Sequence, residues 1–314
     1  MSVSLGIGKD RKLFDRRSML LMGGITTGYF LLSFLLIGFR PEQVFLATLV
    51  NICYFSSHVS RRFITGFSIF IVYWIIFDYM KAFPNYRYAP VHIESLYNLE
   101  RSVFGIHTGG KVLTPNEYWL IYQNPFLDVA TGFFYLSWIP VPLGFAAYLF
   151  FKDKKQFVYF SCTFLLVNLI GFVVYYLCPA APPWYVQQYG FHFNAATAGN
   201  TAGLDRFDRF FHAHIFGSLY AKSSNVFAAM PSLHSAYPAI VFYFGLKNRL
   251  GRINFLFGLV MAGIWFSAVY NSHHYVLDVV AGVCCAVVGI ALFSRMTKSK
   301  NPITKFVQRI INII

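Results

Sequence analysis

Long apolar runs constrain this chain more than any other feature. Eight runs of about 17 to 26 residues alternate with more polar segments, and a helix needs roughly 20 apolar residues to cross a bilayer. Of the 314 residues, 57% are hydrophobic and 12% are charged, which is more apolar surface than one soluble core can bury. We therefore predict an all-α, polytopic integral membrane protein with about eight transmembrane helices. The predicted spans are residues 18–39, 43–60, 63–80, 126–151, 157–177, 231–247, 253–270 and 275–293.

These spans divide the chain into three parts. Residues 1–62 hold a basic leader and two accessory spans, residues 63–294 form a six-helix core, and residues 295–314 form a basic tail. Residues 93–105 have the apolar spacing of a short amphipathic helix at the membrane interface, and the tail could form another. The stretch from Cys178 to Ala229 is predicted as a long loop, because its prolines stop the preceding helix.

Charge follows the predicted spans. The net charge is +14, but the lysines and arginines stand in short clusters between apolar runs, which is typical of membrane topology and not of nucleic-acid binding. With the N-terminus inside, 18 of the 26 lysines and arginines fall on the inner side. We expect both termini to be cytoplasmic and the polar motifs to share the extracytoplasmic face. The five cysteines lack metal-ligand spacing and are interpreted as packed thiols.

Two histidine-containing segments carry the candidate chemistry. His274 and Asp278 stand four residues apart at the start of the last span, so on a helix the carboxylate can reach the imidazole and fix its tautomer. An imidazole held in this way is suited to act as a nucleophile. His234 opens another span, after a proline and a serine that are typical of a helix N-terminus. We expect the fold to bring His234 to His274.

These segments resemble motifs of the type 2 phosphatidic acid phosphatase superfamily of membrane enzymes. That family carries K-x6-R-P, P-S-G-H and S-R-x5-H-x3-D on a six-helix core. The segment Pro231-Ser-Leu-His234 is similar to the second motif. The third motif is matched by Ser267 and Ala268, then five residues, His274, three residues and Asp278.

The departures from these motifs indicate a branch of the family. Leu233 replaces the glycine of the second motif, Ala268 replaces the arginine of the third, and residues 175–185 contain no lysine or arginine where the first motif is expected. The sequences around the two histidines, Pro-Ser-Leu-His-Ser and Ser-His-His-Tyr, together with the earlier Pro-Pro-Trp-Tyr, resemble those of the inositol phosphorylceramide synthase branch. A phosphomonoester dianion needs more positive donors than a phosphodiester monoanion, so the missing cations also favour a phosphodiester substrate.

The resemblance implies a phosphotransferase that moves phosphoinositol, or a similar polyol phosphate, from phosphatidylinositol to a lipid hydroxyl such as that of ceramide. His274 would attack phosphorus, Asp278 would orient it, and His234 would act first as general acid and then as general base. No metal or other cofactor is required. One alternative is a lipid phosphate phosphatase of the same fold, in which water resolves the phosphohistidine. Another is a transporter with buried histidines, although mid-bilayer charges on several helices would then be expected.

Other residues are candidates for substrate contacts. His273 is five residues from Asp278, so the two would not share a helix face. We therefore expect His273 to donate a hydrogen bond to substrate or to be a structural neighbour, and not to be the nucleophile. We expect further substrate contacts from a mixed polar set: Ser232, Tyr275, Asp78, Lys81 and Arg101. Arg206 and Arg209 could also replace the missing phosphate contacts, but each such cation has the simpler interpretation of a surface charge. His212 and His214 have a spacing that could hold a metal in a strand, yet such a pair in a loop is usually solvated.

Overall fold

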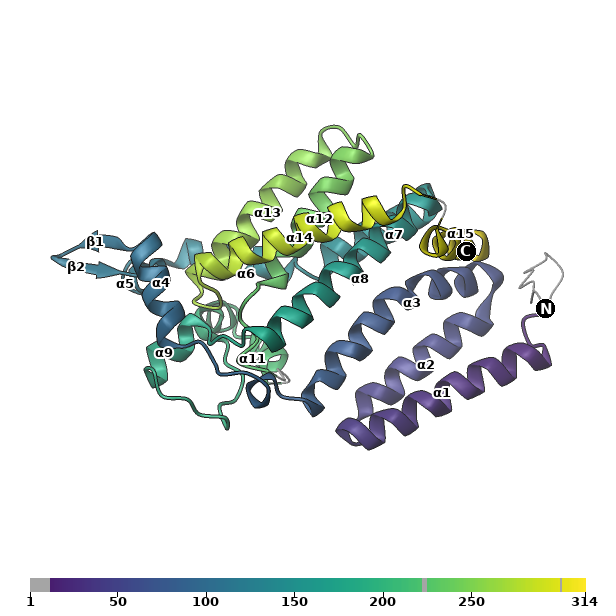
Figure 1. Cartoon of the computed structure of the whole chain (residues 1–314), viewed down its shortest axis with the longest axis horizontal. Helices are drawn as coiled ribbons and strands as arrows, with labels where there is room; N and C mark the ends of the chain where they lie inside the picture. The colour runs from purple at the N-terminus through teal and green to yellow at the C-terminus, as the bar shows by residue number, and fades with distance from the viewer. Residues whose placement is uncertain (1–11, 222–224, 300) are drawn as a thin grey trace. The chain divides into compact units, whose positions relative to one another are not determined.

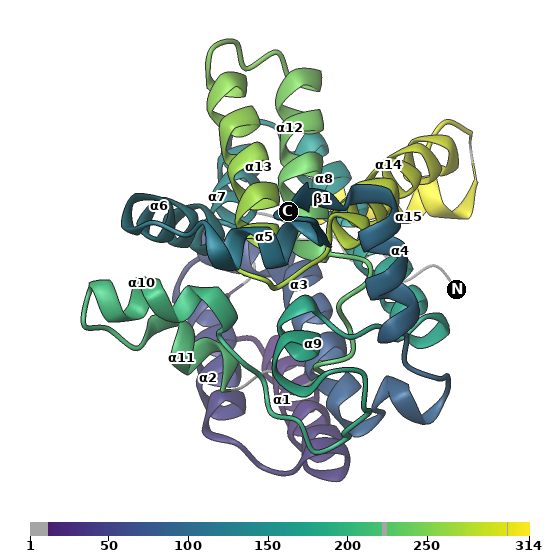
Figure 2. The same cartoon turned by 90° about the vertical axis from the view of Figure 1, so that its left-hand side faces the viewer.

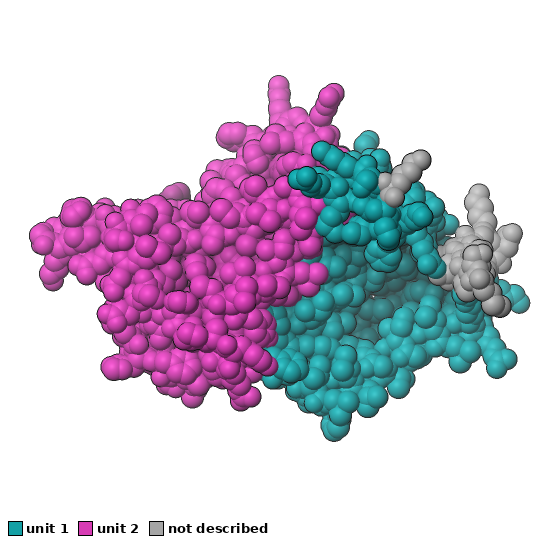
Figure 3. Space-filling model, viewed as in Figure 1, with its two compact units in different colours: residues 1–83, 146–165, 294–314 teal, residues 84–145, 166–293 magenta. Residues whose placement is uncertain are grey.

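The computed structural model describes residues 12–221, 225–299 and 301–314, and their regular secondary structure is almost entirely helical. The chain divides into two compact units (Figure 3). Unit 1 comprises Met1–Phe83, Ala146–Leu165 and Ser294–Ile314, and unit 2 comprises Pro84–Phe145 and Leu166–Phe293. The first eleven residues of the predicted basic leader lie outside the described residues.

Unit 1 is built from long, mostly apolar helices and one shorter amphipathic helix near the C-terminus. They are α1 (Arg16–Ile37), α2 (Pro41–Ser56), α3 (His58–Tyr79) with the 3-10 turn η1 (Met80–Ala82), parts of α7 (Pro140–Lys152) and α8 (Lys154–Leu177), and α15 (Pro302–Ile313). Phenylalanine rings pack α3 on the first half of α8: the ring centroids of Phe67 and Phe157 are 5.4 Å apart, and those of Phe70 and Phe164 are 5.3 Å apart. The helix predicted in the tail is confirmed as α15.

Unit 2 contains the remaining helices and one small hairpin. They are η2 (Asn85–Arg87), α4 (Glu94–Phe104), β1 (Ile106–Thr108), β2 (Lys111–Leu113), α5 (Pro115–Ile121), α6 (Pro125–Leu136), α9 (Pro183–Tyr189), η3 (Ala202–Leu204), α10 (Asp205–Phe210), α11 (Ile215–Tyr220), α12 (Leu233–Lys247), α13 (Ile253–Tyr270) and most of α14 (Val276–Met296). The short helix predicted over residues 93–105 is confirmed as α4. Strands β1 and β2 are antiparallel and joined by Gly109 and Gly110, both with positive φ, as a two-residue hairpin turn requires.

Three helices of unit 2 position the two histidine segments. Helices α12 and α13 run side by side, and the chain passes from the end of α13 into the start of α14 through residues 271–275, which we call the histidine loop (Figure 1, Figure 2). Helices α4, α5, α9 and α11 gather at the same end of α13 and α14 (Figure 1). The histidine loop is therefore surrounded by short helices, while the long helices lead away from it.

Six helical segments of the described chain are long and apolar enough to cross a membrane, consistent with the predicted polytopic membrane protein. The predicted second and sixth spans are shorter than expected: α2 has 16 residues and α12 has 15. At 1.5 Å per residue, α12 extends about 22 Å, less than the roughly 30 Å of the hydrocarbon core. The fourth span is interrupted between Leu136 and Pro140, where a proline that lacks an N–H begins α7.

The segment predicted as a long loop, residues 178–229, is more ordered than expected. It contains α9, η3, α10 and α11, and it buries aromatic side chains such as Trp184, Phe207 and Phe216. Phe207 and Phe216 belong to a hydrophobic cluster with Tyr135 of α6 and Ala268 of α13. These contacts are between segments far apart in the sequence, so the local pattern of the segment does not indicate them.

Candidate active site

The structure brings the two predicted histidines together. His234 is the second residue of α12, and His274 lies two residues before α14. Nδ1 of His234 is 3.4 Å from Nε2 of His274, although 40 residues separate them in the chain. His274 is 6% exposed, and burial lowers its pKa to about 4, so the ring is neutral near pH 7. A neutral imidazole retains the lone pair that a nucleophile needs.

Asp278 stands behind His274, as the four-residue spacing predicts. It is fully buried in the first turn of α14, and its Oδ2 atom is 3.5 Å from Nδ1 of His274. The same oxygen accepts a 2.9 Å hydrogen bond from the N–H of Tyr275. Among the described residues, Nδ1 of His274 and Oδ1 of Asp278 have no hydrogen-bond partner, and such contacts commonly tighten when substrate binds. The arrangement favours the tautomer with its proton on Nδ1, which leaves the lone pair of Nε2 facing His234.

A close approach of α12 and α14 fixes the distance between the histidines. The N–H of Ser232, which precedes α12, donates a 2.9 Å hydrogen bond to the carbonyl of Asp278. One turn further along α14, a Cβ added at Gly282 would lie 2.0 Å from the carbonyl oxygen of Ser232. Only glycine allows the two backbones to approach this closely. The positions of the two motifs relative to each other are therefore set by backbone contacts.

Two polar side chains from distant helices anchor the histidine loop. Nδ2 of Asn116 donates to the carbonyls of Val269 (2.8 Å) and His274 (2.9 Å). The carboxylate of Glu100, 0% exposed, accepts from the N–H groups of Val276 (2.9 Å) and Leu277 (3.1 Å). Glu100 thus satisfies two free N–H groups at the start of α14, where a negative charge is favourable. Burial raises the pKa of Glu100 to about 7.

An aromatic wall contacts His234. The hydroxyl of Tyr135 is 3.2 Å from Nδ1 of His234 and accepts a 3.3 Å hydrogen bond from the hydroxyl of Tyr220. The ring of Trp138 lies edge-on to His234, with centroids 4.4 Å apart. His273 stacks on Tyr220 (4.5 Å) and Tyr135 (5.4 Å), and its Nε2 is 2.8 Å from the carbonyl oxygen of Thr201. Since that contact requires the proton on Nε2 of His273, only its Nδ1 remains to face a substrate.

The other predicted substrate residues are distributed unevenly. Ser232 and Tyr275 are buried next to the two histidines in sequence, and Ser232 also accepts a hydrogen bond from Ser235. Arg101 is exposed on α4, and its Nε donates to the carbonyl of Val112. Asp78 and Lys81 lie in unit 1, where they form a 2.6 Å ion pair with each other.

Arg206 reaches the histidine loop but is already paired. Its Nε is 2.6 Å from Oδ1 of Asp128, an oxygen that also accepts from Tyr270, and one Nη is 3.4 Å from Oδ1 of Asn271. The carboxylate compensates the charge of Arg206. Arg209 is paired with Asp205 on the exposed side of α10.

The sequence prediction missed Glu100, Asn116, Tyr135 and Tyr220. For Glu100 a signal existed: it lies four residues after Leu96, on the buried face of the amphipathic α4. An acidic residue on an apolar face implies a partner. For Asn116 and the two tyrosines, we find no local pattern that would have singled them out.

Comparison with known proteins agrees with the motifs. Residues 107–292 match the PAP2 superfamily. The chain is 42% identical over 267 residues to a phosphoinositol dihydroceramide synthase of Bacteroides thetaiotaomicron, covering 84% of this chain and 88% of that protein. It is 27% identical over 231 residues to the inositol phosphorylceramide synthase catalytic subunit of Schizosaccharomyces pombe, covering 70% of this chain and 51% of the fungal one. The corresponding subunit of Saccharomyces cerevisiae is 28% identical over 222 residues, 68% of this chain and 52% of its own length.

No solved structure matches the chain. The matched residues 107–292 include α12, the histidine loop and the first turns of α14, so they contain His234, His274 and Asp278. This stretch covers more than half of the 314 residues. The chain belongs to the PAP2 superfamily.

Proposed function

We propose that the protein is a membrane phosphotransferase that moves phosphoinositol from phosphatidylinositol to the hydroxyl of a ceramide or dihydroceramide and releases diacylglycerol. The proposal rests on one observation: His234, His274 and Asp278 meet in a chain that is 42% identical to a phosphoinositol dihydroceramide synthase. Covalent catalysis divides the exchange of one alcohol for another into two displacements at phosphorus.

In the first displacement, Nε2 of His274 attacks the phosphorus of the donor lipid. Asp278 holds the opposite nitrogen and stabilises the positive charge that develops on the ring. His234 donates a proton to the departing diacylglycerol oxygen, and the inositol phosphate remains bonded to His274. The attacking nitrogen approaches phosphorus to about 3 Å with the leaving oxygen on the opposite side. The two rings, whose nitrogens are 3.4 Å apart here, therefore separate when the lipid binds.

The second displacement reverses the first with a different alcohol. The ceramide hydroxyl gives its proton to His234 and attacks phosphorus, and the bond to His274 breaks. The products are the inositol-phosphate lipid and the two histidines in their starting forms. The Tyr220–Tyr135 hydroxyl chain keeps His234 in place, since the hydroxyl of Tyr135 contacts Nδ1 of that ring.

The charge around the site favours a phosphodiester. Residues 175–185 carry no lysine or arginine, Ala268 occupies the arginine position of the third motif, and Arg206 is compensated by Asp128. A singly charged phosphodiester requires fewer positive donors than a phosphomonoester dianion. Ser232, Tyr275 and Nδ1 of His273 are the proposed polar contacts from within the site, and Arg101, Asp78 and Lys81 remain proposed contacts from outside it.

The orientation proposed for the membrane puts the site on the extracytoplasmic face and both termini in the cytoplasm, because most cationic clusters then lie inside. Single cysteines at Thr108 of β1 and Asp153 between α7 and α8 test it, on a background without reactive cysteine. In intact cells a membrane-impermeant thiol reagent should label the first and not the second. The reverse pattern would place the site in the cytoplasm.

The function is tested by incubating purified protein with phosphatidylinositol, with and without ceramide, and identifying the products by mass spectrometry. We expect an inositol-phosphate lipid and diacylglycerol, with diacylglycerol release dependent on the acceptor. Phosphatidic acid should be a poor substrate. Hydrolysis of phosphatidic acid to inorganic phosphate with a higher kcat/KM than any exchange would favour a lipid phosphate phosphatase instead.

A further inference from the structure

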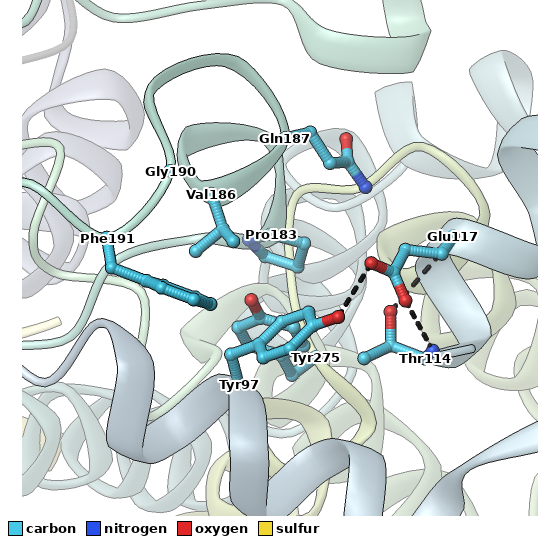
Figure 4. A pocket seen from close by; sticks show the side chains of 9 residues that line it. All are labelled: Tyr97, Thr114, Glu117, Pro183, Val186, Gln187, Gly190, Phe191 and Tyr275. Carbon is cyan, nitrogen blue, oxygen red and sulfur yellow. Dashed lines mark hydrogen bonds between the residues drawn. The ribbon is translucent and has the colours of Figure 1, made fainter. Parts of the chain in front are cut away.

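A cavity of about 150 Å³ in unit 2 adjoins the histidine loop at Tyr275 (Figure 4). Its polar lining comes from Tyr97 of α4, Thr114 and Glu117 at the start of α5, Gln187 of α9 and Tyr275 after His274, and Phe191 closes one side. An apolar cavity of about this volume accommodates a six-membered ring. The cavity is thus large enough for one ring-sized group.

The cavity shares its wall with the proposed nucleophile. Tyr275 follows His274 in the chain, and Gln187 donates a 3.1 Å hydrogen bond to Oγ of Ser272 in the histidine loop. The N–H of Trp184, on the same helix as Gln187, donates to the carbonyl of Ser272 (3.0 Å). A group bound in the cavity would therefore contact the residue that follows His274 in the chain.

The polar groups of the cavity are neutral donors and acceptors together with one carboxylate. Glu117 accepts from the hydroxyl of Tyr97 (2.8 Å) and from the N–H of Thr114 (2.7 Å), and each carboxylate oxygen can accept a further hydrogen bond. The hydroxyl of Tyr275 is buried and has no hydrogen-bond partner among the described residues. In Figure 4 it points toward Phe191 and Pro183. A buried hydroxyl without a partner is unfavourable, so a ligand that supplies one would be stabilised.

The remaining lining is aromatic. The rings of Tyr97 and Phe191 are 5.3 Å apart between centroids and tilted by 58°, and Phe191 is 42% exposed, so its ring can turn aside to admit a ligand. A cyclic polyol has a C–H face that packs against aromatic rings and a rim of hydroxyls that both donate and accept. The lining provides both kinds of contact, and its described residues include no lysine, arginine or histidine that would attract phosphate itself.

We propose that this cavity binds the cyclic polyol head group of the donor phospholipid, so that Tyr275, Gln187 and Glu117 hold its hydroxyls while the phosphate reaches His274. The inference rests on the proposed function, because it names the subsite for the group that this reaction transfers. It assigns to Tyr275 a second task besides donating its backbone N–H to Asp278.

Tyr275→Phe tests the cavity without removing any hydrogen bond that this hydroxyl makes to the described residues. We expect KM for phosphatidylinositol, and Kd for soluble glycerophosphoinositol measured by titration calorimetry, to rise about threefold to tenfold, as the loss of one neutral hydrogen bond predicts. The kcat value and the melting temperature should stay the same or increase. Phe191→Ala, on an exposed ring, should weaken binding similarly. Tyr88→Phe is the matched control, because Tyr88 is 62% exposed and does not line the cavity.

The possible results distinguish a failure of the cavity assignment from a failure of the proposed function. If the wild-type protein transfers inositol phosphate but Tyr275→Phe and Phe191→Ala leave both KM and Kd unchanged, the head group binds elsewhere and the inference is wrong. Tighter binding of glycerophosphocholine than of glycerophosphoinositol would show that the cavity binds a cationic head group, and the assignment to a cyclic polyol would be wrong. If no transfer occurs with any acceptor, the proposed function fails, and the glycerophosphoinositol titration alone decides on the cavity.

Discussion

Helices α1 and α2 expose large apolar side chains, whereas the histidine loop buries polar ones. Large apolar side chains on the first two helices are exposed, for example Leu20 at 67% and Phe45 at 71%. In the histidine loop the side chains are polar, yet Asn271, Ser272, His273 and His274 are 1 to 6% exposed. Lipid is a favourable environment for the first set, whereas each member of the second set must find a partner.

This difference indicates which regions of the chain tolerate substitution. An apolar side chain that faces lipid can be exchanged for another without leaving a gap or an unpaired group. A buried polar loop depends on particular donors and acceptors, and several of them come from distant segments such as Asn116 and Glu100. Substitutions in or beside the histidine loop should therefore affect activity far more than substitutions on α1 and α2.

The largest effect is expected for His274→Ala. Loss of a covalent nucleophile should lower the rate of inositol-phosphate transfer by at least about 1,000-fold, while the protein still folds. Asp278→Asn should be less severe, since it removes the orienting charge but leaves the nucleophile. The control is Phe45→Ala on α2, which should retain activity within about twofold. Rates are measured with purified protein and mass spectrometry, and a His274→Ala variant within about tenfold of the wild type would eliminate the phosphohistidine mechanism.

Gly282→Ala should be the next most damaging change. The added Cβ would lie 2.0 Å from the carbonyl of Ser232 and would force α12 away from α14, separating His234 from His274. A displacement of about 1 Å can reduce a rate roughly 100-fold, and overpacking destabilises by about 1–3 kcal/mol. Gly24→Ala on α1 is the matched control, because no atom of the described residues lies within 4 Å of the position its Cβ would take. Equal activity and equal melting temperature of the two variants would contradict the close approach of α12 and α14.

The sequence predicts the two regions unequally well. Apolar runs predicted α13 to the residue and α14 closely, because lipid exposure imposes a continuous apolar pattern. The four-residue spacing of His274 and Asp278 predicted their contact, although His274 lies two residues before α14 and so is not on its helical face. The contact between Asn116 and the carbonyl of His274 joins residues 158 apart, and no local spacing indicates such a pair. The helices between residues 183 and 220 were missed for the same reason, since their aromatic residues are buried by distant partners.

The smallest effect, and the one that depends on pH, concerns Glu100. Its pKa is raised to about 7, so the carboxylate that accepts from Val276 and Leu277 is increasingly protonated as the pH falls below 7 and becomes a weaker acceptor. Wild-type kcat should therefore rise between about pH 6 and pH 8. Glu100→Gln keeps one acceptor oxygen and loses the charge, so kcat at pH 8 should fall by up to about tenfold, toward the wild-type value at pH 6, and the rise across this window should disappear. Glu94→Gln, at an exposed position on the same helix, should keep the wild-type profile. If Glu100→Gln retains the same rise with pH, the group that titrates is not Glu100, and the histidine loop does not depend on its charge.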